Sequence, residues 1–183
     1  MWVFGYGSII WKVDFPYAVK TVGYIKGYAR KFYQLSMDHR GTRENPGRVV
    51  TIVPDSAHSR VWGVAFKVPD NFIDQVIHHL DIREKGGYIR KNLTFFPLYG
   101  HPPFDSVVYV GQEHHENFSG GADEDSIALQ IVNAVGSSGT NVEYLLNLAK
   151  SLRAIAPLVD EQHLYNVEEK VLKLLEDQGK SLK

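Results

Sequence analysis

The 183-residue chain contains no cysteine and only two methionines. Without cysteine, disulfides, a thiol nucleophile, and zinc or iron–sulfur sites held by thiolates are all excluded. The formal net charge is −1, so there is no electrostatic case for binding nucleic acid or an anionic membrane. No stretch approaches the roughly 18–20 apolar residues of a membrane span, and no positively charged leader precedes the apolar start. These features predict a soluble, cytosolic protein.

The composition is that of an ordinary globular protein. Hydrophobic residues make up 44% of the chain and charged residues 22%. A chain of this length buries a sizeable core without disulfide or metal support. We therefore predict a single domain over residues 1–183, with a helical C-terminal third.

The first two-thirds of the chain has the pattern of short β-strands. β-Branched and aromatic residues alternate with polar ones, and Gly, Pro and Asp separate the runs. Short runs separated by turn signals predict a small, closed or nearly closed sheet. The strand pattern covers residues 2–6, 21–35, 48–53, 60–68, 93–98 and 106–111.

One helix interrupts these strands. Pro69-Asp70 is a helix-start signal, and apolar residues then recur at helical spacing as far as Leu80. The helix must end before Gly86-Gly87, because glycine is costly inside a helix. Glu84 therefore lies at the helix C-terminus or just after it. The helix dipole disfavours an acid there, which indicates a role other than stabilising the helix.

The last third of the chain shows three amphipathic helical segments. Thr140 is a capping residue for the second, with Glu143 placed to reach back; Pro157 ends that segment and Asp160 starts the third. The fold class predicted is α+β, with a small mixed β-barrel-like sheet and flanking helices. The three apolar faces are Ile127, Ile131, Val132 and Val135; Tyr144, Leu145, Leu148, Ala149 and Leu152; and Leu164, Val167, Val171, Leu174 and Leu175.

The stretch Gly5-Tyr6-Gly7-Ser8 follows the first predicted strand. A glycine-bracketed turn exposes consecutive backbone N–H groups, which suit a carboxylate or phosphate, and Ser8 adds a hydroxyl. The phosphate version is weak, because neither Gly-Lys-Ser/Thr nor a complete GxGxxG is present. A plain tight turn after a strand is the alternative and the commoner meaning of such a pattern.

A dense polar segment runs from Asp38 to Arg48, between two predicted strands. Its arginines (Arg40, Arg43 and Arg48) offer planar forks for a substrate carboxylate. A solvated loop with an internal Asp–Arg pair is the simpler interpretation, and the pattern favours it.

The eight histidines do not form a metal-binding pattern. His39 stands alone among polar neighbours. The adjacent pairs His78-His79 and His114-His115 cannot direct both imidazoles at one metal from a helix or strand. We predict neither a metal nor another cofactor.

Glu84, within LDIREKGGY, is a candidate general acid/base. Asp81 lies three residues earlier and would be its neighbour on a helix. A carboxylate among aromatic and glycine-rich surroundings suits proton transfer. The alternative is a surface acid paired with Arg83 or Lys85, which is the usual situation of a glutamate.

Together these pieces resemble the ChaC family of γ-glutamylcyclotransferases, and most of all its short members. The resemblance rests on WVFGYGSIIWK, DHRGT…NPGRVVT, LDIREKGGY, YVG at Tyr109 and SSGTNVEYL, which follow the family's order from Trp2 to about Leu152. It implies a small β-barrel-like sheet with flanking helices. It also implies an enzyme specific for glutathione that forms 5-oxoproline and L-cysteinylglycine without a cofactor.

The resemblance also assigns roles to individual residues. Glu84 falls on the family's single catalytic glutamate, and the substrate-contacting segment falls on Val3, Phe4, Gly5, Tyr6, Gly7 and Ser8. The family's Tyr-Gly-Ser-Leu hallmark has Ile9 in place of Leu. Two further elements depart: a Gly-Pro-Ser-Gly element is Gly-Ser-Ser-Gly at residues 136–139, and a Leu-Gly-Pro-Ala-Pro stretch is replaced over residues 119–125.

Two other functions remain compatible with these residues. The same ring closure acting on other γ-glutamyl amines or dipeptides is one. A non-catalytic module that binds its ligand in the same place is the other, although an intact Glu84 argues against it. The expected partner is the small molecule glutathione, with no nucleic acid or membrane; the sequence leaves the oligomeric state open.

Overall fold

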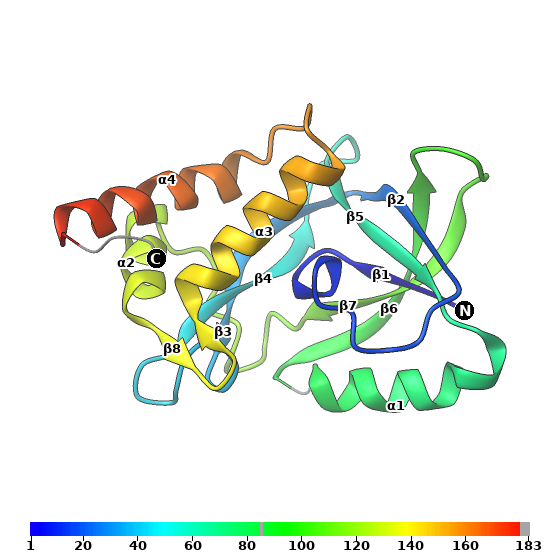
Figure 1. The fold of residues 1–183 in the computed structure, drawn as a ribbon, viewed down its shortest axis with the longest axis horizontal. Helices are drawn as coiled ribbons and strands as arrows, with labels where there is room; N and C mark the ends of the chain where they lie inside the picture. Colours follow the sequence, from blue (N-terminus) through cyan, green and yellow to red (C-terminus); the bar gives the residue numbers. More distant parts are fainter. Residues whose placement is uncertain (85, 180–183) are drawn as a thin grey trace.

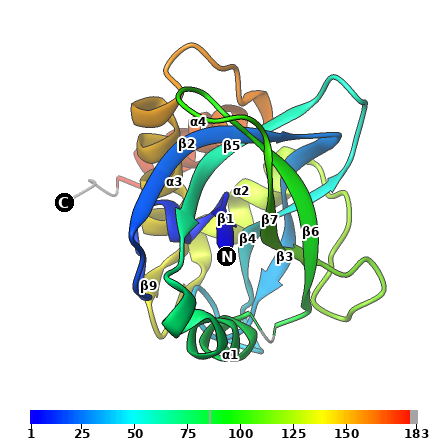
Figure 2. The same ribbon diagram turned by 90° about the vertical axis from the view of Figure 1, so that its right-hand side faces the viewer.

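The structure, a computed structural model, describes residues 1–84 and 86–179. Five strands close into a barrel in the order β1-β5-β2-β6-β7, in which only the β1–β7 pair is parallel. Figure 2 shows these strands curving around β1. This confirms the expected α+β fold with a small closed sheet. The barrel strands are β1 (Trp2–Gly5), β2 (Val19–Lys26), β5 (Arg60–Lys67), β6 (Tyr88–Pro97) and β7 (Phe104–Gly111).

A separate two-stranded sheet, β3 (Tyr28–Ser36) with β4 (Gly47–Pro54), runs from the barrel to the helical side of the molecule (Figure 1). The strand pattern over residues 21–35 thus belongs to two strands in two sheets. They separate at Gly27, whose φ of +80° lies in the left-handed region that favours glycine. No alternation pattern marks this change of sheet, because both strands have period two.

Helix α1 (Ile73–Arg83) follows a short 3-10 turn, η2 (Asp70–Phe72), and begins close to the predicted start signal. Its buried residues, Val76 and Leu80, pack on a small core that includes Val3, Val64 and Phe66. The neighbouring residues Phe4 and Ala65 of the same strands face the main core instead. The period of two along β1 and β5 therefore places α1 on one face of the sheet and the barrel interior on the other.

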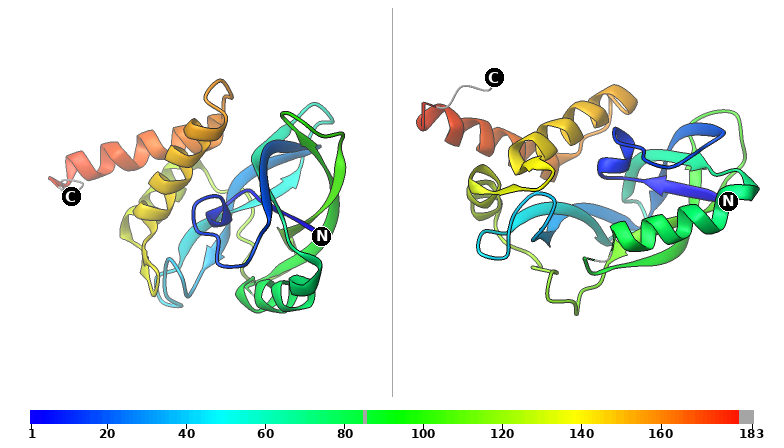
Figure 3. Two further views of the ribbon diagram at one scale, coloured as in Figure 1. Left: turned by 45° about the vertical axis from the view of Figure 1, so that its right-hand side comes forward. Right: turned by 60° about the horizontal axis from the view of Figure 1, so that its bottom comes forward.

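The C-terminal helices are α2 (Glu124–Asn133), α3 (Asn141–Ile155) and α4 (Gln162–Asp177), which lie together beside the barrel (Figure 3). Thr140 caps α3 as predicted, because its hydroxyl accepts a hydrogen bond from the Glu143 N–H at 3.1 Å. The prediction was wrong for Val135. It is 56% exposed and lies in β8 (Val135–Gly136), which pairs with β9 (Gly139–Thr140), so it is not on the apolar face of α2.

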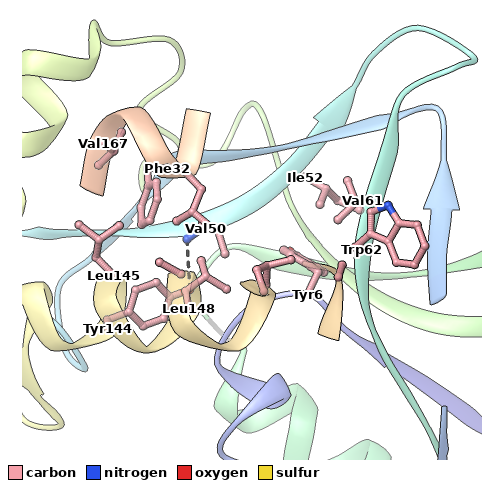
Figure 4. Packing of buried hydrophobic residues seen from close by; sticks show 14 of the residues in the cluster. Tyr6, Phe32, Val50, Ile52, Val61, Trp62, Tyr144, Leu145, Leu148 and Val167 are labelled. Atoms are coloured by element: carbon pink, nitrogen blue, oxygen red, sulfur yellow. Dashed lines mark hydrogen bonds between the residues drawn. The ribbon is translucent and has the colours of Figure 1, made fainter. Parts of the chain in front are cut away.

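The apolar faces of α3 and α4 form most of the main core on the helical side. Figure 4 shows Leu145, Leu148 and Val167 gathered around Phe32 and Val50 of the β3–β4 sheet. Each fully buried aliphatic or aromatic side chain of this kind stabilises the fold by roughly 1.5–3 kcal/mol. Within the described ranges, the helices are all too short or too polar to cross a membrane.

Candidate active site

The chain turns sharply where β1 ends. Residues 8–10 form the 3-10 helix η1 (Ser8–Ile10), closed by a hydrogen bond from the Ile10 N–H to the Gly7 carbonyl at 3.0 Å. The first N–H groups of any helix have no partner inside it, and those of Ser8 and Ile9 bond to no other described residue. We call residues 5–10 the N-terminal loop. It presents backbone donors, as the sequence pattern allowed.

Glu84 lies at the C-terminal end of α1. Its N–H donates to the Leu80 carbonyl at 2.8 Å, and its own carbonyl accepts from the Tyr88 N–H at 3.3 Å. The turn from Glu84 to Tyr88 needs glycine at position 87, because Gly87 has a φ of +98°, in the left-handed region. A Cβ on Gly87 would also come within 2.5 Å of His115 Nδ1. Gly87 therefore allows the turn by which the chain passes from α1 and Glu84 into β6.

Arg83 connects Glu84 to the N-terminal loop. One terminal nitrogen of its guanidinium donates to Ser8 Oγ at 2.8 Å, and the other donates to Asp14 Oδ1 at 2.7 Å. Its Nε lies 3.4 Å from Glu84 Oε1. Ser8 and Arg83 are 75 residues apart in the sequence. The predicted base and the predicted binding loop thus share one guanidinium.

Glu84 is not a solvated surface acid. Its side chain is only 19% exposed, although Arg83 is near it as the alternative interpretation supposed. Lys85, the other suggested partner, lies outside the described residues. Burial raises the pKa of the Glu84 carboxyl above its ordinary value; Arg83 and His79 oppose this shift, and Asp14 adds to it. A raised pKa suits a group that must both accept and return a proton near neutral pH.

Three tyrosine hydroxyls surround the same region. Tyr6 donates to the Tyr109 carbonyl at 2.6 Å, and Tyr88 donates to the Val50 carbonyl at 2.8 Å. The Tyr144 hydroxyl accepts from the Val50 N–H at 3.3 Å, which leaves its own proton available to another acceptor (Figure 4). A Cβ on Gly7 would lie 3.2 Å from that hydroxyl, so Tyr144 borders the N-terminal loop.

The tyrosines remain neutral donors at physiological pH. Burial is the main cause that raises the pKa of Tyr6 and Tyr88 and brings that of Tyr144 to about 12. The negative charge of Glu84 raises all three pKa values further. Tyr88 and Tyr144 both bond to Val50, Tyr144 borders Gly7, and Ser8 reaches Glu84 through Arg83. Glu84, the N-terminal loop and three hydroxyls therefore form one cluster.

The predicted substrate-contacting residues divide into two groups. Tyr6, Gly7 and Ser8 lie in the loop beside Tyr144 and Arg83. The side chains of Val3 and Phe4 are 0% and 2% exposed and belong to the two cores on either side of β1. These two positions therefore shape the strand that leads into the loop. Gly5 leaves room for Ile9, since a Cβ there would come within 2.8 Å of Ile9 Cγ2.

Comparison with known proteins identifies the family. The family described as ChaC-like protein matches residues 1–174. The chain belongs to the ChaC family. The resemblance seen in the sequence is confirmed over nearly the whole chain.

Among curated relatives, the glutathione-specific γ-glutamylcyclotransferase 1 of Danio rerio is 42% identical over 94% of this chain and 89% of its own length. The glutathione-specific γ-glutamylcyclotransferase of Schizosaccharomyces pombe is 35% identical over 96% and 94%. A crystal structure of a yeast γ-glutamyl cyclotransferase specific to glutathione superposes with a TM-score of 0.88 at 29% identity. It covers 94% of this chain and 96% of the yeast chain.

The polar segment from Asp38 to Arg48 has another role than either interpretation expected. Its exposed members, among them Arg43, fit the solvated loop, but Arg40 and Arg48 are 6% exposed. Arg40 bonds to the Thr140 carbonyl and to Glu143, and Arg48 bonds to Gln130 and the Phe32 carbonyl. Arg40 therefore attaches the β3–β4 loop to the start of α3, and Arg48 attaches β4 to α2 and β3.

Both departures from the ChaC pattern lie outside the contacts of Glu84. Residues 136–139 form the β8–β9 turn, where the Ser137 and Ser138 N–H groups donate to the carbonyls of Asp38 and His39. Residues 119–125 lead into α2, and Asp123 caps that helix. Asp81, expected beside Glu84, instead accepts from the Tyr109 hydroxyl at 2.7 Å and pairs with Arg90.

Sequence reasoning missed three members of the cluster as functional candidates: Arg83, Tyr88 and Tyr144. Tyr144 was included only as part of an apolar helix face. One signal was present there, because a tyrosine on an otherwise aliphatic face carries a hydroxyl that needs a partner when buried. Arg83 and Tyr88 had no comparable signal, since their contacts depend on where β1 and β4 come to lie.

Proposed function

We propose that this ChaC-family chain is a glutathione-specific γ-glutamylcyclotransferase that converts glutathione to 5-oxoproline and L-cysteinylglycine. The observation that carries the proposal is the position of Glu84: a mostly buried carboxylate that shares the Arg83 guanidinium with the N-terminal loop. Curated relatives that are named for this activity, at 42% and 35% identity, support it.

Glu84 acts first as a base. The α-amine of a γ-glutamyl group has an ordinary pKa of about 8, so at neutral pH it is mostly ammonium and cannot attack. Glu84 removes that proton, and the amine then attacks its own γ-carbonyl carbon. The attack is intramolecular, so selecting the folded conformer supplies effective molarities on the order of 10⁵ M or more.

Glu84 then acts as an acid. The new C–N bond closes a five-membered ring, and the old amide C–N bond breaks as Glu84 delivers its proton to the departing cysteinylglycine nitrogen. The attacking nitrogen loses a second proton as it becomes the lactam N–H, and Glu84 passes this proton to the released amine, which leaves as an ammonium. The glutamate returns to its starting state, and neither water nor an oxidant is consumed. One carboxyl group with a raised pKa serves both transfers, which contribute roughly 10²–10⁴-fold to the rate.

The N-terminal loop holds the γ-glutamyl group in this proposal. The segment that the resemblance assigns to substrate contact, Val3, Phe4, Gly5, Tyr6, Gly7 and Ser8, comprises the end of β1 and the start of this loop. Its backbone N–H groups face the substrate carboxylate or the oxyanion that develops on the γ-carbonyl. The uncharged Tyr144 hydroxyl, whose own proton is not used by Val50, supplies a further donor without competing for the proton of Glu84. No metal or other cofactor enters the reaction as proposed, and the location proposed is the cytosol.

The direct test incubates the purified protein with glutathione and follows 5-oxoproline and cysteinylglycine by mass spectrometry. Equal molar release of both products supports the proposal. Parallel incubations with γ-glutamyl-alanine and γ-glutamyl-lysine test the specificity for glutathione. Binding of glutathione without release of either product would instead identify a binding module.

A further inference from the structure

Arg30, on β3, is the buried cation that contacts the N-terminal loop from behind. Its side chain is 1% exposed, and its Nε donates to the Tyr6 carbonyl at 3.0 Å. A terminal nitrogen donates to the Trp62 carbonyl of β5. The other terminal nitrogen lies 2.6 Å from Glu161 Oε1, just before α4. One guanidinium therefore joins the loop, the barrel and the helical third.

Arg30 is more than a packing contact, because its charge is buried and paired. A buried charge is costly unless it is paired, and the cost is met here by a carboxylate that is itself only 10% exposed. Arginine presents its donors in one rigid plane, so the carbonyls of Tyr6 and Trp62 fix the orientation of the guanidinium, while Glu161 balances its charge. The Tyr6 carbonyl is thereby held by a group that has little freedom to move.

Holding that carbonyl also directs the next amide. The Tyr6–Gly7 peptide is trans, and in a trans peptide the C=O and N–H groups point in opposite directions. The Gly7 N–H must therefore point away from Arg30. Gly7 borders Tyr144, so its amide belongs to the part of the loop that lies in the catalytic cluster.

We propose that Arg30, whose buried charge is balanced by Glu161, is a positioning residue that sets the direction of the Gly7 N–H for binding the γ-glutamyl group. Arg30 does not touch the substrate; it acts through the Tyr6–Gly7 peptide. The inference rests on the proposed function of the loop. It also gives α4 a role in the active site, since Glu161 immediately precedes that helix.

The test uses Arg30→Lys, which keeps the charge but cannot hold two carbonyls and a carboxylate in one plane. The ligand is glutaryl-cysteinylglycine, which lacks the attacking amine and therefore binds without turnover. We expect its Kd by calorimetry to rise about tenfold or more, as for the loss of a hydrogen bond from a charged donor. The ¹H–¹⁵N resonance of Gly7 should shift, and the acid limb of the kcat/KM profile should stay where Glu84 sets it.

Arg48→Lys is the matched control. Arg48 is also a buried arginine that donates to a backbone carbonyl, that of Phe32, but it does not contact the loop. The Kd of Arg48→Lys for glutaryl-cysteinylglycine should stay within about twofold of that of the unchanged protein, because Arg48 shares no bonding partner with the loop. Glu161→Gln should act in the same direction as Arg30→Lys, and it replaces that variant if Arg30→Lys does not fold.

Two results would overturn the inference: an unchanged Kd and Gly7 resonance in Arg30→Lys or Glu161→Gln, or an equal loss in Arg48→Lys. Failure of the proposed function has a different signature. In that case the unchanged protein does not release 5-oxoproline from glutathione, while the Gly7 resonance still reports whether Arg30 orients the peptide.

Discussion

The barrel side and the helical third of this protein bury different kinds of residue. The strands and their loops enclose most of the buried polar groups, including Arg30, Gln34 and Thr51, at 4%, 0% and 0% exposure. The helices contribute mainly aliphatic side chains such as Leu148 and Val171, both 0% exposed. Buried polar groups add little net stability, but their hydrogen bonds fix the orientation of the groups that they join. Burial of aliphatic side chains stabilises the fold without fixing such orientations. The comparison predicts that changes at the buried polar groups of the strands alter activity and that changes at the buried aliphatic groups of the helices alter stability.

The largest expected effect is that of Glu84→Gln. The amide keeps the size of the side chain but cannot accept the substrate's proton, so kcat should fall about 10²–10⁴-fold. Single-turnover assays with glutathione measure this loss, and calorimetry with the inert glutaryl analogue should give an unchanged Kd. A variant with the original kcat would show that another group moves the proton.

Gly7→Val comes next and acts on binding. A Cβ added at Gly7 would lie 3.2 Å from the Tyr144 hydroxyl and 3.3 Å from Val50 Cγ2, so the valine methyls would fill the space between the loop and these two residues. We expect KM to rise about tenfold or more, with a smaller change in kcat. Gly121→Val is the control, because a Cβ there makes only ordinary contact with Tyr33. An unchanged KM for Gly7→Val would exclude the loop as the cradle.

Leu152→Ala tests the helical side of the comparison. Leu152 is 0% exposed on α3, and the cavity left by alanine should lower the free energy of unfolding by about 2–5 kcal/mol. Urea denaturation measures this loss, and kcat/KM well below the melting temperature should be unchanged. The 99% exposed Leu158 provides the control Leu158→Ala. A large loss of activity in folded Leu152→Ala would show that the two sides are not separate in function.

The smallest expected effect concerns stability and pH. Because burial raises the pKa of Glu84 in the folded protein, folding favours the protonated form. The free energy of unfolding should therefore fall as pH rises through that raised pKa. Arg83 and His79 act against the effect of burial on this pKa, which keeps the change in stability small. Glu84→Gln resembles the protonated form, so it should be more stable than the original protein at pH 7. The two should converge below the unfolded pKa, and denaturation at several pH values measures the difference.

Local patterns were sufficient for most elements. The strand runs, the helix from Pro69 to the double glycine and the Thr140 cap follow from period, propensity and capping chemistry. Three outcomes differed. The alternation of residues 21–35 continues across the sheet change at Gly27, and the apolar helical spacing of α2 continues past its end to the exposed Val135. The strand predicted over residues 93–98 begins earlier, at Tyr88. That residues 1–183 form a single domain stays a prediction.

The chain's own order of residues was enough to indicate an α+β protein, its ChaC family, and Glu84 with the Gly5–Ser8 turn as its chemical centre. It contained no information on Arg83 reaching Ser8, on Tyr144 bordering Gly7, or on Arg30 holding the Tyr6 carbonyl across 24 residues. Periodicity is a property of neighbouring residues, so a short window reveals it. Contacts between distant residues exist only once the barrel has closed and the helices have packed against it, because closure sets which groups are near enough to pair.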